Sequence, residues 1–225
     1  MIDLGPMARE IEARIAAACA RSARSRDEIT LVAVTKTHGA DVVEAALAAG
    51  IADIGENRVQ EAREKIASVG RRARWHLIGH LQSNKAAEAA RLFDVVQSVD
   101  SASLAAKLGK AAANEGRTLD VLIQVNVGSE EQKSGIDPRE VGSLARAIEA
   151  VPALRLRGLM AVPPFLPPEE VRPYFRELRA LRDEVLAWSA NCRELSMGMS
   201  DDFEVAIEEG ATMIRVGRAL FGARG

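Results

Sequence analysis

Cysteine and histidine, from which disulfide frameworks and zinc sites are built, are scarce in this sequence. The 225 residues include two cysteines, Cys19 and Cys192, which do not form a CxxC pair. Two cysteines so far apart indicate neither a disulfide framework nor a zinc site, and Cys19, in an Ala-rich stretch, is expected to be a small core residue. The three histidines form no HxH or HExxH motif, so we expect no metal site.

Long apolar runs and an excess of charge of either sign are also missing. No run approaches the ~18 apolar residues of a membrane-spanning helix. The first segment mixes Asp3 and other charges into its apolar positions, unlike a signal peptide. The net charge is −2, and the arginines alternate with Glu and Ala, which is typical of solvated helix faces. We therefore expect a cytoplasmic protein without a nucleic-acid or membrane partner.

The chain instead alternates short apolar runs with longer stretches rich in Ala, Leu, Glu and Arg. The runs are expected strands and the stretches expected helices. The first five runs begin at residues 30, 52, 74, 95 and 119, a step that accommodates one strand, one helix and two short loops. The expected strands are Thr30–Val34, Ala52–Ile54, Arg74–Ile78, Val95–Val99, Leu119–Val127, Leu154–Ala161, Arg193–Met197 and Thr212–Val216.

Eight such units predict an α/β protein, a single (β/α)8 TIM barrel over residues 1–225. Runs such as LVAV and VLIQVNV are nearly continuously apolar and do not alternate, as in parallel strands that are covered on both sides. A doubly wound open sheet is the alternative, but it usually has about five or six strands. An extra helix is expected over Asp3–Ala23, against the barrel bottom or side. The Pro-rich stretch Val162–Pro168 is expected to be a stiff rim loop.

The active site of such a barrel lies at the C-terminal ends of the strands, which directs attention to Lys36. Val32, Val34 and Lys36 share one face of the first strand. If that face points inward, Lys36 is a partly desolvated amine that can attack an aldehyde. The alternative is a lysine that extends into solvent as the strand ends, and the pattern alone favours it.

The loops after the seventh and eighth strands predict a phosphate site. Gly198 allows close backbone approach, Ser200 can donate to a phosphate, and Gly217 exposes backbone N–H groups. The alternative is an ordinary helix N-cap at Ser200 or Asp201 and an ordinary glycine turn. The carboxylates that follow Ser200 count against an anion unless they face away.

Arg215 lies inside an expected buried strand, where an unpaired guanidinium is costly. Its partner is either a carboxylate or an acceptor on a bound ligand. Asn57 and Gln60 have the spacing of an N-cap and its reciprocal partner, so a cap is the favoured role of Asn57. His80 has no carboxylate, Ser or Cys partner at a spacing that indicates catalysis, so we expect it on the rim or in packing.

A series of sequence blocks identifies a family resemblance. They are AVTKT (33–37), GENRVQE (55–61), WHLIGHLQSNK (75–85), QVN (124–126), KSGI (133–136), LRLRGLMAVP (154–163) and SMGMSDDFEVAIEEGATMIRVGRALFG (196–222). In these blocks, in this order, the chain resembles the YggS-type pyridoxal phosphate homeostasis proteins. The resemblance implies a barrel like the N-terminal domain of alanine racemases, of the fold-type III group, and pyridoxal 5′-phosphate as cofactor.

The resemblance also implies roles for individual residues. Lys36 matches the lysine that forms an imine with the cofactor aldehyde, and Ser200 matches a serine that contacts the phosphate. Gly217 and Arg218 match positions that offer backbone N–H groups to it. The implied cofactor-binding residues are Lys36, Asn57, Ser200, Arg215, Gly217 and Arg218.

The position of Arg215 in the family, opposite the pyridine nitrogen, bears on function. An arginine cannot accept a proton and disfavours a protonated ring, so the ring stabilises a carbanion poorly. Racemases with this arrangement add a second base, usually a tyrosine of another domain, whereas the one tyrosine here is Tyr174 and no second domain is expected. His38 and His80 stand where the family often has proline, away from the imine lysine.

These implications favour a protein that buffers, protects or delivers pyridoxal phosphate over an enzyme. The expected partners are the cofactor and apo-enzymes that use it, and the expected state is a monomer. One alternative is an amino-acid racemase or related enzyme that uses the same site. A second is a barrel that binds another phosphorylated metabolite.

Overall fold

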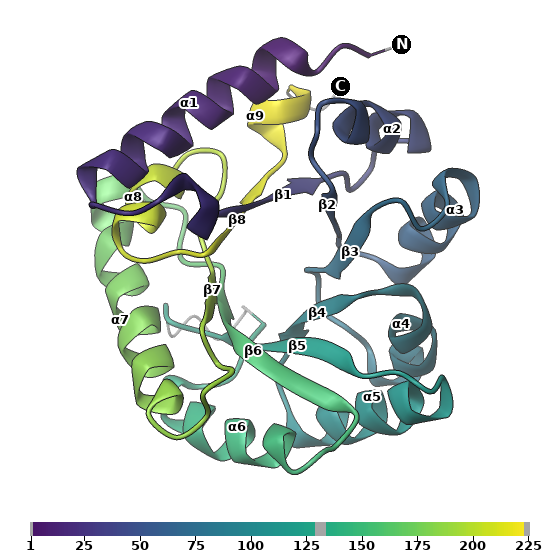
Figure 1. Cartoon of the computed structure of the whole chain (residues 1–225). Helices are drawn as coiled ribbons and strands as arrows, with labels where there is room; N and C mark the ends of the chain where they lie inside the picture. The colour runs from purple at the N-terminus through teal and green to yellow at the C-terminus, as the bar shows by residue number, and fades with distance from the viewer. Residues whose placement is uncertain (1, 129–133, 223–225) are drawn as a thin grey trace.

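The computed structural model describes residues 2–128 and 134–222. Within these residues, eight parallel strands close into a barrel in chain order, with β8 paired to β1 (Figure 1). The strands are β1 Thr30–Val34, β2 Asp53–Glu56, β3 Arg74–Leu77, β4 Val95–Val99, β5 Leu119–Val125, β6 Leu154–Ala161, β7 Glu194–Ser196 and β8 Met213–Val216. The predicted barrel is confirmed, the open sheet is excluded, and the predicted strand ends differ by at most two residues.

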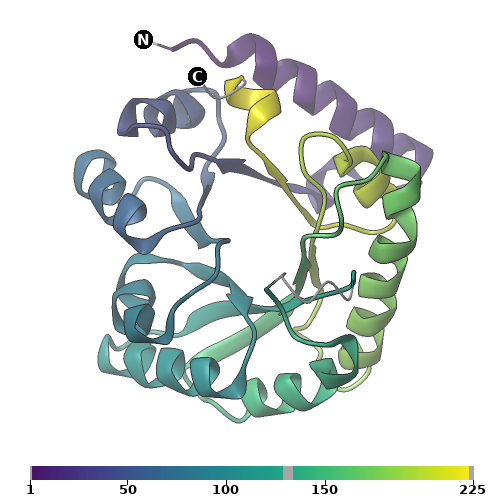
Figure 2. The ribbon, with the colours of Figure 1, turned by 180° about the vertical axis from the view of Figure 1, so that it is seen from behind.

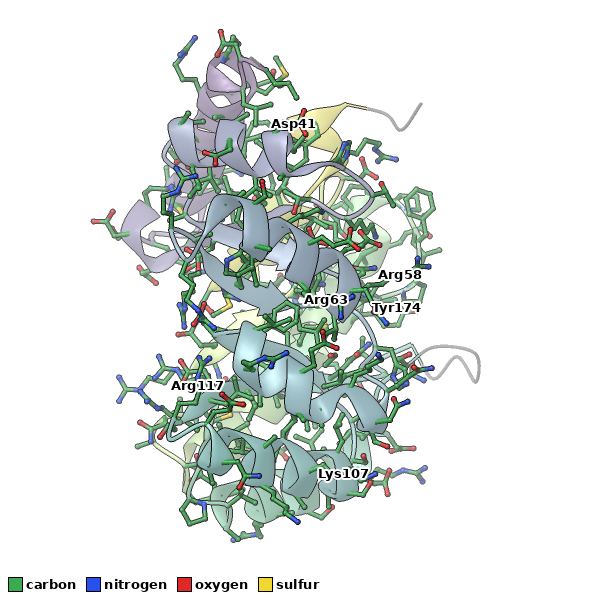
Figure 3. All side chains as sticks on the ribbon, turned by 90° about the vertical axis from the view of Figure 1, so that its right-hand side faces the viewer. Asp41, Arg58, Arg63, Lys107, Arg117 and Tyr174 are labelled. Atoms are coloured by element: carbon green, nitrogen blue, oxygen red, sulfur yellow. The ribbon has the colours of Figure 1, made fainter. Side chains whose placement is uncertain are left out.

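Helices surround the barrel as an outer ring, which Figures 1 and 2 show from the two opposite sides. They are α1 Gly5–Arg21, α2 Ala40–Ala48, α3 Val59–Val69, α4 Ala86–Leu92, α5 Ala102–Asn114, α6 Val141–Glu149, α7 Pro168–Leu186, α8 Phe203–Glu208 and α9 Arg218–Phe221. Charged side chains cover this ring, including the labelled Arg63 on α3 and Lys107 on α5 (Figure 3). These charges are the solvated helix faces that the sequence predicts.

The side-chain alternation of each strand produces two apolar layers. On β4, Val96 and Val99 belong to the large core between strands and helices. Val95 instead contacts Leu122 and Met160 in a separate small cluster. This small cluster fills part of the barrel interior, so the barrel is packed and not an open channel.

The extra helix at the N-terminal end packs on the side of the barrel. The helices α8 and α9 have only six and four residues, which leaves part of the ring uncovered. Helix α1 contacts both of them and buries Ile11, Ile15 and Cys19 against the barrel (Figure 1). Of the two positions expected for this helix, the side is confirmed and the bottom is wrong. Cys19 is a core residue, as expected.

The Pro-rich segment after β6 forms the expected rim loop, which joins β6 to α7. Its Phe165 side chain is 85% exposed, the most exposed of the large hydrophobic residues in the described part of the chain. Among the described helices, none is both long enough and apolar enough to cross a membrane.

Candidate functional site

A cavity of about 630 Å³ opens at the C-terminal ends of the barrel strands. Its volume lies within the ~300–1,000 Å³ that is usual for sites of small ligands. The cavity is lined by Val34, Lys36, His38, Asn57, Ile78, Val162, Phe165, Met199, Ser200, Asp201, Arg215, Gly217, Arg218 and Gly222. All six residues that the sequence predicts for the site therefore lie around one cavity.

Lys36 lies two residues beyond the end of β1 and is partly buried at the cavity wall. The inward-facing alternative is therefore correct, and the solvent-exposed alternative, which the pattern alone favours, is wrong. The next residue, Thr37, has φ of 68°, a left-handed conformation that is unusual for a β-branched residue. Its backbone N–H donates to Glu61 Oε2 at 2.9 Å. This backbone conformation and this hydrogen bond determine the direction in which the polypeptide leaves Lys36.

A buried ion pair supports the same strand end. Lys65 Nζ lies 2.5 Å from Glu56 Oε1 and donates to the Thr35 carbonyl at 2.7 Å. The Thr35 hydroxyl also donates to Glu56. Glu56 is fully buried, and this burial raises its carboxyl pKa, an effect that the bonds from Lys65 and Thr35 partly offset. The residue before Lys36 is thus held on both its side chain and its carbonyl.

Glu56 and Lys65 are not among the site residues predicted from the sequence, although a sequence pattern indicates that Lys65 is buried. The buried positions of α3 are Val59, Ala62, Lys65 and Val69, a helical spacing of three or four residues. Lys65 therefore lies on the buried face of an amphipathic helix. A buried lysine needs an anionic or carbonyl partner, and Glu56 at the end of β2 is that partner.

Arg215 lies within β8 and is 4% exposed. Its NH1 donates to Ser196 Oγ at 2.6 Å and its NH2 to the Ala161 carbonyl at 2.8 Å. Burial lowers its pKa to about 10, partly offset by the nearby Asp202, so the guanidinium remains charged at neutral pH. Within residues 2–128 and 134–222, no carboxylate forms an ion pair with it. The carboxylate pairing considered from the sequence is therefore not found there, and the side chain lines the cavity.

The loop after β7 is shaped by Gly198, whose φ is +90°. A Cβ at this position would lie 2.5 Å from Ala206 Cβ, so only glycine fits. In the loop, Asp202 Oδ1 accepts from the Met199 N–H at 2.6 Å, which turns this carboxylate away from solvent. Burial raises the pKa of Asp202.

The capping alternative for this loop is wrong. Helix α8 begins at Phe203, its N-cap is Asp202, and no side chain caps it. Ser200 instead accepts from the Ala219 N–H at 3.2 Å, at the start of α9. Its hydroxyl thus joins the end of β7 to the end of β8, where the sequence predicts the phosphate.

Gly217 and Arg218 complete this end of the cavity. A Cβ on Gly217 would lie 3.2 Å from the Val34 carbonyl oxygen, so glycine keeps the space between the first and last strands open. The Arg218 guanidinium pairs with Asp201, which neutralises one of the two carboxylates that count against an anion.

Asn57 lines the cavity but is not a helix cap. Helix α3 begins at Val59 after Arg58, and no side chain caps it. The predicted cap is wrong because β2 extends through the buried Glu56 and delays the helix start. His80 lies on the rim as expected, with its Nδ1 3.4 Å from Asp100 Oδ2 and a half-exposed ring.

Two further sequence expectations concern tyrosine and metal ions. Tyr174 lies on α7, packed against the outer core, and is not among the residues that line the cavity. Across the described ranges, no group of three or more His, Cys, Asp or Glu side chains is arranged to hold a metal ion. The KSGI block begins at Lys133, outside the described residues, and its Ile136 pairs with Gln124 and Asn126 at the end of β5.

Comparisons with known proteins agree with this architecture. The family model for the N-terminal domain of alanine racemase matches residues 9–225. The chain is 42% identical over 214 residues to the pyridoxal phosphate homeostasis protein of Aquifex aeolicus, with 94% of each chain covered. It is 41% identical over 234 aligned positions to the protein of that name from Escherichia coli K12, which covers 100% of this chain and 98% of the other.

A solved structure leads to the same family. PipY of Synechococcus elongatus PCC7942, solved with pyridoxal phosphate bound, superposes with a TM-score of 0.82 and 38% identity, covering 94% of this chain and 100% of that one. Identity of this level over nearly the whole chain confirms the resemblance expected from the sequence blocks. The chain belongs to the alanine racemase N-terminal domain family and, within it, to the pyridoxal phosphate homeostasis proteins.

Proposed function

We propose that this protein binds pyridoxal 5′-phosphate as an imine on Lys36 and serves intracellular vitamin B6 homeostasis. The observation that supports this most strongly is the composition of one cavity. A lysine amine, a buried arginine, and Ser200 and Gly217 from the loops after β7 and β8 all line it. The names of its relatives and the cofactor in PipY support the same proposal.

The phosphate end of the cavity fits the proposed ligand. The first N–H groups of a helix have no partner within it and attract anions. Ser200 Oγ already accepts one of them, from Ala219, so an oxygen acceptor is accommodated at this place. Gly217 leaves room beside Val34, and Arg218, which also lines the cavity, offsets the charge of the Asp201 carboxylate.

The ring end of the cavity fits an aromatic acceptor. Val34, Ile78 and Met199 supply apolar wall, and the Arg215 guanidinium can only donate hydrogen bonds. It therefore suits an unprotonated ring nitrogen. When bound, the cofactor supplies an aldehyde carbon open to attack by an amine and a ring that can accept electrons.

The same residues favour holding the cofactor over turning it over. A protonated ring nitrogen, which an electron sink requires, is disfavoured beside the cationic Arg215. Tyr174, the sole tyrosine of the sequence, lies away from the cavity. We propose a cytoplasmic monomer that stores the cofactor and passes it to apo-enzymes.

The visible spectrum of the purified protein with added cofactor tests this proposal. We expect an imine absorption that borohydride removes, with the reduced adduct mapped by mass spectrometry to Lys36. The absorption should be lost in Lys36→Ala and retained in Lys85→Ala, a partly exposed lysine of the rim. An adduct on another lysine, or no imine, contradicts the proposal.

The racemase alternative has its own readout. Single-enantiomer amino acids are incubated with the loaded protein in heavy water, and exchange of the α-proton is followed by NMR. Exchange at enzymatic rates that vanishes in Lys36→Ala would contradict storage as the sole function. Imine formation without such exchange supports it, and transfer is then measured as activation of an apo-enzyme that depends on pyridoxal phosphate.

A further inference from the structure

Buried polar side chains cross the interior of the barrel, where apolar residues are usual. Beginning at the cavity, Arg215 NH1 donates to Ser196 Oγ at 2.6 Å, and Ser196 Oγ donates to Gln97 Oε1 at 2.5 Å. Gln97 Nε2 lies 2.9 Å from His76 Nδ1, and His76 Nε2 lies 2.8 Å from Asp53 Oδ1. These side chains form a continuous hydrogen-bond chain from β8 through β7, β4 and β3 to the first residue of β2.

The interior members of this chain are sealed from solvent. Ser196, Gln97 and His76 are each 0% exposed, and Asp53, at the opposite end of the barrel from the cavity, is partly exposed. Each buried polar atom named in the chain has a partner, which avoids the cost of an unsatisfied group. The chain is thus a complete network, and removal of one member leaves its neighbours unsatisfied.

The two ends of the chain impose one direction on every bond. A guanidinium can only donate, and the carboxylate of Asp53 can only accept. Ser196 and Gln97 must then each accept from the cavity side and donate toward Asp53. Gln97 Nε2 can only donate, so His76 Nδ1 accepts from it and His76 Nε2 bears the proton that faces Asp53.

We propose that Ser196, Gln97 and His76 are positioning residues that hold the Arg215 guanidinium toward the cavity through a one-way hydrogen-bond chain that ends on Asp53. This inference rests on the proposed function, because the ring of the cofactor is the ligand that Arg215 is held to meet. The Ala161 carbonyl fixes the NH2 side of the guanidinium, and Ser196 fixes the NH1 side. Without Ser196, the guanidinium can turn about its remaining contact.

The first test compares two buried serines. Ser196→Ala breaks the chain, whereas Ser98→Ala removes a fully buried hydroxyl that has no hydrogen-bond partner in the described part of the chain. We expect the dissociation constant of pyridoxal phosphate to rise roughly tenfold in Ser196→Ala, with a shifted absorption of the bound cofactor, and to stay near the wild-type value in Ser98→Ala. Equal affinity and an equal spectrum in all three proteins would overturn the proposal.

The second test needs no cofactor. With only three histidines in the sequence, His76 can be assigned by ¹⁵N NMR after substitution of the other two. We expect the Nε2–H tautomer in the wild type at neutral pH. In Gln97→Glu, a carboxylate oxygen replaces the donor facing Nδ1, so the ring should instead donate from Nδ1. An Nδ1–H tautomer in the wild type, or no change of the His76 signals in Gln97→Glu, would refute the proposed direction of the hydrogen-bond chain.

The two proposals can fail separately. If the wild type forms no imine, the proposed function is wrong, and the His76 tautomer still reports on the chain. If the wild type forms the imine but Ser196→Ala binds the cofactor as the wild type does, the positioning role alone is wrong.

Discussion

Substitution of Lys65 by methionine tests the support beneath Lys36. Methionine keeps an apolar stem of similar length and removes the ammonium group. The Glu56 carboxylate then keeps only the Thr35 hydroxyl as a donor, and the Thr35 carbonyl loses its bond at 2.7 Å. Because Glu56 is fully buried, water cannot replace the missing charge without opening the end of the strand.

The size of the effect follows from this burial. Removal of one partner of a buried ion pair costs about 3–5 kcal/mol, and the remaining Thr35 bond places Lys65→Met near the lower value. For a chain of this length, about 3 kcal/mol corresponds to a fall of roughly 6–12 °C in the melting temperature. Arg63→Met on the same helix is the matched control, because its pair with Glu88 at 3.1 Å involves a half-exposed arginine. Such a pair contributes at most about 1 kcal/mol.

The loss of unfolding free energy in Lys65→Met depends on pH. Burial raises the pKa of Glu56 in the folded protein above its unfolded value, and loss of Lys65 raises it further. A folded state that binds the proton more tightly gains stability as the pH falls through that raised pKa toward the unfolded value near ~4.3. The stability deficit of Lys65→Met is therefore largest at neutral pH and shrinks as the solution becomes acidic.

Urea unfolding of the wild type, Lys65→Met and Arg63→Met at neutral pH and at about pH 5 measures these differences. A deficit in Lys65→Met no larger than that of Arg63→Met would refute the buried pair as a stabilising contact. A deficit that is the same at both pH values would refute the assignment of the uncompensated charge to Glu56. Glu56→Gln in the Lys65→Met background should recover part of the loss, since no buried charge then remains.

Further substitutions test the cavity wall and the loop after β7. Gly198→Ala should lower the free energy of unfolding by about 2–4 kcal/mol, because the φ of Gly198 is +90° and the added methyl group meets Ala206. The control is Gly222→Ala, at a glycine with φ of +86° and no atom within 4 Å of the added Cβ. It should lower the free energy of unfolding by only about 1 kcal/mol in the same assay. Arg218→Gln should weaken cofactor binding about fivefold and reduce its salt dependence in titrations at two ionic strengths. Phe165→Ser should change stability by less than about 0.5 kcal/mol and speed cofactor release in stopped-flow absorption, because its ring lines the cavity but is 85% exposed.

The barrel could be predicted because its strands differ sharply in composition from its helices. Runs such as Thr30–Val34 are almost continuously apolar, a pattern typical of a strand covered on both sides. The rule that barrel chemistry lies at strand C-terminal ends then selected Lys36 and Gly217. Both line the cavity. The pattern alone favoured the exposed alternative for Lys36, because strand alternation does not say which face points inward.

The support of the site could not be predicted in the same way, because it depends on how the end of a strand packs against the helix that follows it. Glu56 and Lys65 lie nine residues apart, and their contact requires β2 to end beside the buried face of α3. The same burial of Glu56 extends the strand and moves the helix start past Asn57, which is why the cap spacing misleads. A local motif describes the neighbours of a residue along the chain and not those across the barrel.

For Arg215, the charge of the residue and its position in a strand together predict part of its environment. The sequence requires a partner for a guanidinium within a buried strand, but either a carboxylate or a ligand would satisfy it. Its observed acceptors are a hydroxyl and a backbone carbonyl, so the positive charge is solvated by dipoles and only moderated by Asp202. A cavity wall with that charge favours a ligand that offers an acceptor atom and disfavours one that arrives protonated there. The Ala161 carbonyl, the hydrogen-bond chain that begins at Ser196 and the nearby Asp202 together make a buried cation tolerable at the cavity.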